Sequence, residues 1–114
     1  MLDFAVNQRS TDAGHTVLDL VGELDLAGAV IMRTAGLAAL GDPACTTLVL
    51  DVSALSFVDS TGIGSWVELR SHAHQNAQHV ALRGASDNLS RILTIAGLTS
   101  LFDLEPPAPD GHRS

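Results

Sequence analysis

The chain has 114 residues, of which 46% are apolar and 17% are charged. This length suits one domain, and the apolar share is high enough to bury a core, which excludes a chain disordered throughout. Its 13 acidic residues outnumber 6 basic ones, all of them Arg, so the net charge is −7. An acidic protein repels phosphate backbones and anionic lipid, which argues against nucleic acid and membrane surfaces as partners.

Three further features of the sequence predict a cytoplasmic protein. No apolar run approaches the roughly 18 residues of a membrane span. The first ten residues include Asp3 and lack the basic segment of a signal peptide. The single cysteine, Cys45, allows no intrachain disulfide and fits a reducing compartment. Because Cys45 has no basic neighbour in the sequence to activate it, we expect an unreactive thiol.

Hydrophobic periodicity predicts an alternation of strands and helices. Leu2, Phe4 and Val6 alternate with other residues, which is typical of a half-exposed strand at the edge of a sheet. A strand over residues 16–21 follows after a turn and should form a hairpin with the first strand. The later predicted elements are a helix over 26–40, a strand over 47–52, a loop over 53–58, a helix from Asp59 or Ser60 to about Asn76, a strand over 80–82, a helix over 86–96 and a strand over 101–104. This order, β-β-α-β-α-β-α-β, predicts a single α/β domain with a mixed, mostly parallel sheet and packed helices.

The end of the chain differs in composition from the rest. Pro106, Pro107 and Pro109 forbid a helix and cannot join a central strand. We therefore expect a folded domain over residues 1–105 and a disordered, proline-rich tail over residues 106–114.

The residues best placed for chemistry follow the buried strand over 47–52. A helix is expected to begin there with Asp59, Ser60, Thr61 and Gly62, and open α/β sheets place their sites at the carboxyl ends of their strands. Free amides and the helix dipole favour an anion at such a helix start. A phosphate attached to an exposed Ser60 hydroxyl would therefore be accepted at this helix start. The alternative is that Ser60 is only the N-cap of the helix.

Enzymatic interpretations of the same segment have less support. Gly62 and Gly64 begin a dinucleotide-binding pattern, but Val67 stands where its third glycine belongs, and the chain has no phosphate-loop motif. A small hydrolase with Ser60 as nucleophile would need a histidine beside it. The next histidines lie three to four turns further along the same helix and are out of reach.

The histidines favour solvated side chains over a metal site. His72 and His74 are two residues apart on a helix, so they point to different faces. His79 follows, but no carboxylate or thiolate completes a set of ligands around these three residues.

Three carboxylates and the single tryptophan leave alternatives open. Asp25, Asp51 and Asp59 fall near strand ends or helix starts, where together they could bind Mg²⁺, although helix caps are the commoner role. Asp25 is also the expected N-cap of the helix over 26–40. Trp66 either packs in the core or anchors a partner on a surface, where tryptophan is enriched.

Three segments of this chain resemble the anti-sigma factor antagonists of the STAS domain class. They are Gly-Glu-Leu-Asp-Leu at residues 22–26, Leu-Asp-Val-Ser at residues 50–53, and Phe-Val-Asp-Ser-Thr-Gly-Ile-Gly at residues 57–64. The resemblance covers about residues 2–105. It implies a STAS-like fold in which the family's usual last helix is missing, because prolines occupy its place.

The resemblance implies a non-catalytic bacterial regulator of transcription, of the kind that acts in stress response and sporulation. Such a protein binds an anti-sigma factor that is also an ATP-dependent serine kinase, and the binding releases a sigma factor. The kinase phosphorylates the serine that matches Ser60, the antagonist dissociates, and a metal-dependent serine phosphatase resets it. The resemblance implies no cofactor, and we expect a monomer or a weak dimer.

By the same resemblance, Asp25 lies beside the phosphorylatable serine and forms part of the partner-binding surface together with Asp59 and Thr61. Gly62 and Gly64 would keep the helix start slim enough for a partner to approach closely. An alternative that keeps the fold is a STAS module that senses a ligand or scaffolds a larger complex without a phospho-switch.

Overall fold

The computed structural model describes residues 3–11 and 13–107, which form one five-stranded sheet with three helices. The elements are β1 (Phe4–Ser10), β2 (His15–Leu24), α1 (Leu26–Leu40), β3 (Thr47–Val58), α2 (Ser60–Gln75), β4 (His79–Arg83), α3 (Asp87–Ile95) and β5 (Asp103–Glu105). The strands lie side by side in chain order, from β1 at one edge to β5 at the other. β1 and β2 form an antiparallel hairpin, and every later pair is parallel. The prediction of a mixed, mostly parallel sheet is confirmed.

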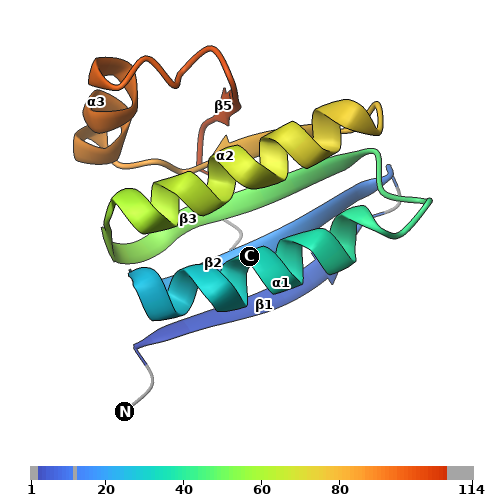
Figure 1. The fold of residues 1–114 in the computed structure, drawn as a ribbon, viewed down its shortest axis with the longest axis horizontal. Coiled ribbons are helices and arrows are strands. Elements are labelled where there is room, and N and C mark those ends of the chain that lie inside the picture. The colour runs from blue at the N-terminus through green and yellow to red at the C-terminus, as the bar shows by residue number, and fades with distance from the viewer. Residues whose placement is uncertain (1–2, 12, 108–114) are drawn as a thin grey trace.

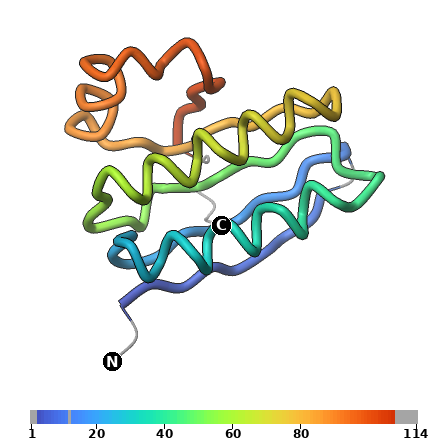
Figure 2. Tube along the Cα trace, viewed as in Figure 1, coloured from blue at the N-terminus to red at the C-terminus, as the bar shows by residue number. Residues whose placement is uncertain are grey.

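Helices α1 and α2 lie next to one another on one face of the sheet (Figure 1). Each parallel strand is added on the same side of the preceding one, so right-handed crossovers bring successive helices to the same face. Figure 2 follows the chain to α3 and β5, which lie at the end of the sheet away from β1. The main core fills the space between helices and sheet; its fully buried members include Leu18, Leu20, Leu48, Leu50, Leu82, Met32, Trp66 and Leu69.

The two central helices approach each other closely because one contact position is a glycine. A Cβ atom on Gly36 of α1 would lie only 2.5 Å from Cδ1 of Leu69 on α2. Leu69 itself is fully buried in the main core. The close packing positions α2 against α1, and therefore positions the start of α2 beside the start of α1.

The predicted loop over residues 53–58 is wrong, because β3 continues to Val58. Its second half pairs with β2, ending with Leu24 opposite Val58. Two register shifts each insert one more residue of β3 than of β2, between Asp19 and Val21 and between Gly22 and Glu23. These bulges break the regular alternation that marks a strand, while the ladder continues on either side of them.

Smaller differences concern the two ends of the chain. β1 runs over Phe4–Ser10 instead of beginning at Leu2, which lies outside the described residues. The last strand covers Asp103–Glu105 instead of 101–104, because the amide of Leu101 donates to the carbonyl of Leu98 in a turn. Of the expected tail the structure describes only residues 106 and 107, and residues 108–114 lie outside the described part.

Candidate functional site

The starts of α1 and α2 meet at the carboxyl edge of the sheet. Leu24 and Val58 are paired at the ends of β2 and β3, and Asp25 and Asp59 are the next residue of each chain segment. The Asp59 amide donates to the carbonyl of Leu24 at 3.2 Å, which ties the two segments together. Both helices therefore begin at the same end of the sheet, as Figure 1 shows. This arrangement brings Asp25 and the Asp59–Gly62 segment to one edge of the sheet, whereas their roles in partner binding stay a prediction.

Each of these aspartates is the N-cap of the helix that follows it. Asp25 Oδ1 accepts a hydrogen bond from the Gly28 amide at 3.0 Å. Asp59 Oδ1 accepts from the amides of Thr61 and Gly62, both at 3.0 Å, and also from the Thr61 hydroxyl. The hydrogen bond from the Thr61 hydroxyl, followed by that from the Gly62 amide, lowers the pKa of Asp59 below its ordinary value. Asp59 is therefore a carboxylate at neutral pH.

The cap geometry decides between two interpretations of Ser60. Asp59 is the N-cap and Ser60 is the first residue of α2, so the interpretation of Ser60 as a capping serine is wrong. Ser60 is exposed, and its hydroxyl makes no hydrogen bond to any residue that the structure describes. The amides of Thr61 and Gly62, expected to receive an anion, are instead occupied by Asp59. A phosphate on Ser60 would therefore lie beside a carboxylate.

The neighbouring hydroxyls are engaged in hydrogen bonds. Thr61 donates to Asp59, and Ser56 donates to the carbonyl of Gly22 at 3.2 Å. Among these three hydroxyls, only that of Ser60 has no partner in the described part of the chain. The free hydroxyl of this segment is thus the one at the very start of the helix.

The two glycines of this segment have different surroundings. A Cβ on Gly62 would lie 2.7 Å from Cγ of Leu24, 2.8 Å from Cγ2 of Val58 and 2.9 Å from the Leu24 carbonyl oxygen. Gly62 is therefore needed to seat the start of α2 on the ends of β2 and β3. A Cβ on Gly64 would have no atom within 4 Å, so the chain itself does not require a glycine there.

Two exposed apolar side chains flank this site and were missed by the sequence analysis. Leu26, the residue after Asp25, is 68% exposed, and Phe57, two residues before Asp59, is 51% exposed. Each is an apolar residue in a segment that also contains core residues, so the sequence does not distinguish these two exposed side chains from buried ones. Leu26 begins α1 two residues after the end of β2, and Phe57 lies one residue before the end of β3, so both border the same edge of the sheet.

The metal interpretations have no support in the described residues. Asp51 lies seven residues before Val58 within β3, opposite Asp19 and Arg83, and its Oδ1 accepts from the amide and hydroxyl of Ser53. It is therefore separated from Asp25 and Asp59. Across residues 3–11 and 13–107 no group of three His, Cys, Asp or Glu side chains is arranged to hold a metal ion, and this includes His72, His74 and His79.

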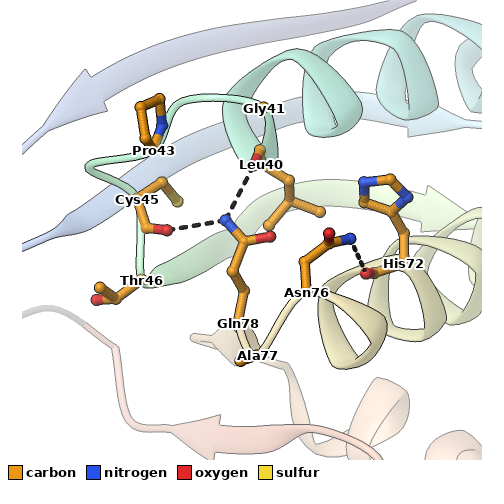
Figure 3. A pocket seen from close by; sticks show the side chains of 9 residues that line it. All are labelled: Leu40, Gly41, Pro43, Cys45, Thr46, His72, Asn76, Ala77 and Gln78. Atoms are coloured by element: carbon orange, nitrogen blue, oxygen red, sulfur yellow. Dashed lines mark hydrogen bonds between the residues drawn. The ribbon is translucent and has the colours of Figure 1, made fainter.

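Trp66 and Cys45 are both buried. Trp66 of α2 is fully buried in the main core. Of the two alternatives for this residue, core packing is therefore correct and a surface anchor is not. Cys45 lies at the opposite end of the sheet, in the pocket of Figure 3, where the side-chain amide of Gln78 donates to the carbonyls of Leu40 and Cys45. Burial of the Cys45 thiol agrees with the expectation of an unreactive group, and its reactivity stays a prediction. No helix within the described residues is long and apolar enough to cross a membrane.

Comparison with known proteins shows the family. Residues 7–104 match the family model described as "Mlab, STAS domain", so the chain belongs to the STAS domain family. It is 26% identical over 104 residues to an anti-sigma-B factor antagonist of Listeria monocytogenes, which covers 91% of this chain and 90% of the relative. The family named from the sequence motifs is thereby confirmed.

Solved structures share the same fold. Phosphorylated SpoIIAA from Bacillus is similar with a TM-score of 0.74 and 22% identity, covering 95% of this chain and 96% of that one. An anti-sigma factor antagonist from Mycobacterium paratuberculosis is similar with a TM-score of 0.81 and 23% identity, covering 96% and 91%. The likeness extends over nearly the whole of each chain, so these proteins share the fold of the described residues.

Proposed function

We propose that this protein is an anti-sigma factor antagonist whose complex with an anti-sigma factor is switched off by phosphorylation of Ser60. The observation that carries the proposal is the exposed Ser60 hydroxyl at the start of α2, which has no hydrogen-bond partner within residues 3–11 and 13–107, whereas the hydroxyls of Ser56 and Thr61 are engaged. The names of the similar proteins support the general role, and one of them, SpoIIAA, has been solved in a phosphorylated and an unphosphorylated form.

The proposed reaction is a phosphoryl transfer performed by the partner, an anti-sigma factor with serine kinase activity. The Ser60 hydroxyl oxygen attacks the γ-phosphorus of the partner's ATP, ADP leaves, and the hydroxyl proton passes to a base of the kinase. In this reaction the chain supplies the acceptor and its position, and the kinase supplies the catalytic residues. A metal-dependent serine phosphatase would transfer the phosphoryl group to water, which releases inorganic phosphate and returns Ser60 to its hydroxyl form.

The release step follows from the charges around Ser60. Phosphorylation adds about −1.5 to −2 charges at pH 7. Asp59 already holds the nearest amides as a carboxylate, and Asp25 caps the neighbouring helix. Because the new charge cannot bind those amides without displacing Asp59, it projects toward the partner. A partner surface fitted to the neutral hydroxyl then loses both shape and charge complementarity.

The partner-binding surface of the proposal consists of Asp25, Asp59, Ser60 and Thr61, with Gly64 as an open position on the helix. Leu26 and Phe57 add exposed apolar area at its border. Apolar side chains beside a polar centre are typical of protein interfaces. Binding of an anti-sigma factor here would release the sigma factor that it holds.

The proposal is tested by incubating the purified protein with ATP and the kinase-type anti-sigma factor encoded by the same genome. Peptide mass spectrometry should find one phosphoryl group, on Ser60. Ser60→Ala should remove it, whereas Ser56→Ala, as the matched control at the other exposed serine of this segment, should leave it. Stable binding without phosphorylation would instead favour a scaffolding or sensing STAS module. Hydrolysis of an ester substrate that is lost in Ser60→Ala would favour a hydrolase.

A further inference from the structure

A second polar pocket lies at the end of α2 away from Ser60. It has a volume of about 250 Å³. Its lining residues are Arg70, His74, Gln78, His79, Val80, Ser100, Leu101 and Asp103. Arg70 and His74 come from α2, His79 begins β4, and Ser100 belongs to the turn before β5. At about 1.5 Å per residue, Arg70 lies about 15 Å along the helix from Ser60, so the two sites are separate.

The pocket gathers basic groups in a protein that is strongly acidic. Arg9, Arg33 and Arg83 each lie within 4.0 Å of a carboxylate. Arg70 is half-buried and yet has no such carboxylate among the described residues. Asp103 lines the same pocket without forming an ion pair there. A guanidinium that is partly removed from water and not neutralised favours an anion as its partner.

The end of the helix does not oppose an anion here. The last carbonyls of α2 already accept hydrogen bonds within the chain: those of Ala73 and His74 accept from the amides of Asn76, Ala77 and Gln78. The negative end of the helix dipole is therefore compensated by backbone donors. Beside the carboxylate of Asp103, the pocket presents side-chain donors, namely a guanidinium, two imidazoles and a hydroxyl.

We propose that this pocket binds a tetrahedral oxyanion of the phosphate class. Arg70 would supply two parallel N–H donors to two oxygens, which is the geometry that phosphate and guanidinium share. His74 and His79 would donate from their rings and Ser100 from its hydroxyl. The volume leaves room for a small substituent on the phosphate. Asp103, which also lines the pocket, opposes further negative charge on that substituent.

The charged and titratable groups that line the pocket are Arg70 and His74 from α2, His79 from β4 and Asp103 from β5. Arginine keeps its charge at any ordinary pH, so Arg70 is the group on which the test depends. Sulfate is a suitable second probe, because it has the tetrahedral shape of phosphate and its own charge does not change near neutral pH.

The test is a titration of the ¹⁵N-labelled full chain with inorganic phosphate, and separately with sulfate, at constant ionic strength maintained by sodium chloride. The backbone signals of His79, Ser100 and Leu101 should shift and saturate. Arg70→Gln should weaken binding by about tenfold or more, as the loss of a charge-assisted pair does. The matched control is Arg91→Gln, which removes an exposed arginine outside the pocket and should change affinity less than about twofold.

Sulfate should shift the same backbone signals as phosphate, and Arg70→Gln should weaken its binding by a similar factor. Should Arg70→Gln fail to fold, His79→Gln at the exposed start of β4 tests the same site. Shifts that do not saturate, or that Arg91→Gln weakens as much as Arg70→Gln, would mean non-specific screening and overturn the proposal. Ser60→Ala should leave the affinity unchanged, so this result stands or fails independently of the phospho-switch.

Discussion

Asp25 and Asp59 occupy equivalent positions on neighbouring parallel strands, each following one member of the Leu24–Val58 pair and each capping a helix. Two carboxylates are thereby held at one edge of the sheet, on either side of the point where the Asp59 amide donates to the carbonyl of Leu24. The hydroxyl of Ser60 emerges next to this pair. The arrangement explains why one phosphoryl group at Ser60 would change the charge of the whole edge.

Substitution of the two glycines of α2 should separate packing from helix propensity. Gly62→Ala should destabilise the fold by about 1–3 kcal/mol, because the new methyl group overlaps Leu24 and Val58. Gly64→Ala meets open space and should stabilise it by about 0.5–1 kcal/mol, since alanine is the better helix former. Urea unfolding of both variants measures the difference. Similar effects in the two variants would contradict the close seating of α2 on the strand ends.

The acid sensitivity of the fold should depend in part on Asp59. Its folded-state pKa is lowered, so its contribution to stability is complete above the unfolded-state pKa of about 3.9 and is lost as the pH falls toward the folded-state value. Asp59→Asn keeps an oxygen for the cap and removes the charge. The variant should melt at a lower temperature than the natural chain at pH 7. The difference between the two melting temperatures should become smaller at pH 3.

The matched control for this titration is Asp103→Asn, which removes one exposed charge that makes no hydrogen bond within the described residues. It corrects for the general effect of lowering the net negative charge. Circular dichroism melts at pH 7, 5 and 3 give the comparison. If the difference in melting temperature between Asp59→Asn and the natural chain stays constant over this range, the carboxylate charge does not contribute to the stability of the fold.

The helix starts could be predicted from the sequence, whereas the strand end beside them could not. Asp25 and Asp59 precede helical segments and have the chemistry of N-caps, which is a local signal. The second half of β3 has no such signal, because its two bulges interrupt the alternation and its ladder exists only through β2. The same holds for Gly62, whose need for a glycine comes from Leu24 on another strand.

The site residues show the same division between local and tertiary information. Motif and spacing could place Ser60 at the sheet edge, but its free hydroxyl depends on which neighbour caps the helix. The exposure of Leu26 and Phe57 depends on where β2 and β3 end in space. The residue type of an apolar side chain does not show whether it is buried in the core or exposed beside a site, so the sequence alone cannot distinguish the two cases.

Two substitutions of Asp25 should separate its role as a cap from a role in partner binding. Asp25→Asn retains a capping oxygen and should change stability little, because asparagine and aspartate are comparable N-caps. It should nevertheless change the affinity for the anti-sigma factor or the rate of Ser60 phosphorylation by at least about tenfold, which corresponds to about 1.4 kcal/mol.

Asp25→Ala removes the bond to the Gly28 amide and should cost about 1 kcal/mol of stability as well. Urea unfolding and calorimetric titration with the partner measure the two effects separately. If neither variant alters binding or phosphorylation while Asp25→Ala loses stability, then Asp25 is a structural cap alone.

The switch itself should be visible as a loss of affinity when Ser60 becomes charged. One unit charge against another at 4 Å is worth about 4 kcal/mol at an effective dielectric constant of 20, and salt screens a large part of it at an exposed site. Loss of fit against a close-packed partner adds to what remains. Phosphorylation of Ser60 should therefore weaken the complex by at least about 2 kcal/mol, or roughly thirtyfold. Ser60→Ala should bind without being switched, and Ser60→Glu should bind weakly.

The matched control is Ser71→Glu, which adds the same charge at an exposed position of α2 eleven residues further along the helix. Since about 16 Å of helix separates the two positions and exceeds the screening length at physiological salt, Ser71→Glu should bind like the natural chain. Calorimetric titration of the three variants and of the phosphorylated protein gives the dissociation constants. A Ser60 phosphoprotein that binds within threefold of the unmodified form, or an equal loss in Ser71→Glu, would show that net charge or another residue controls the complex.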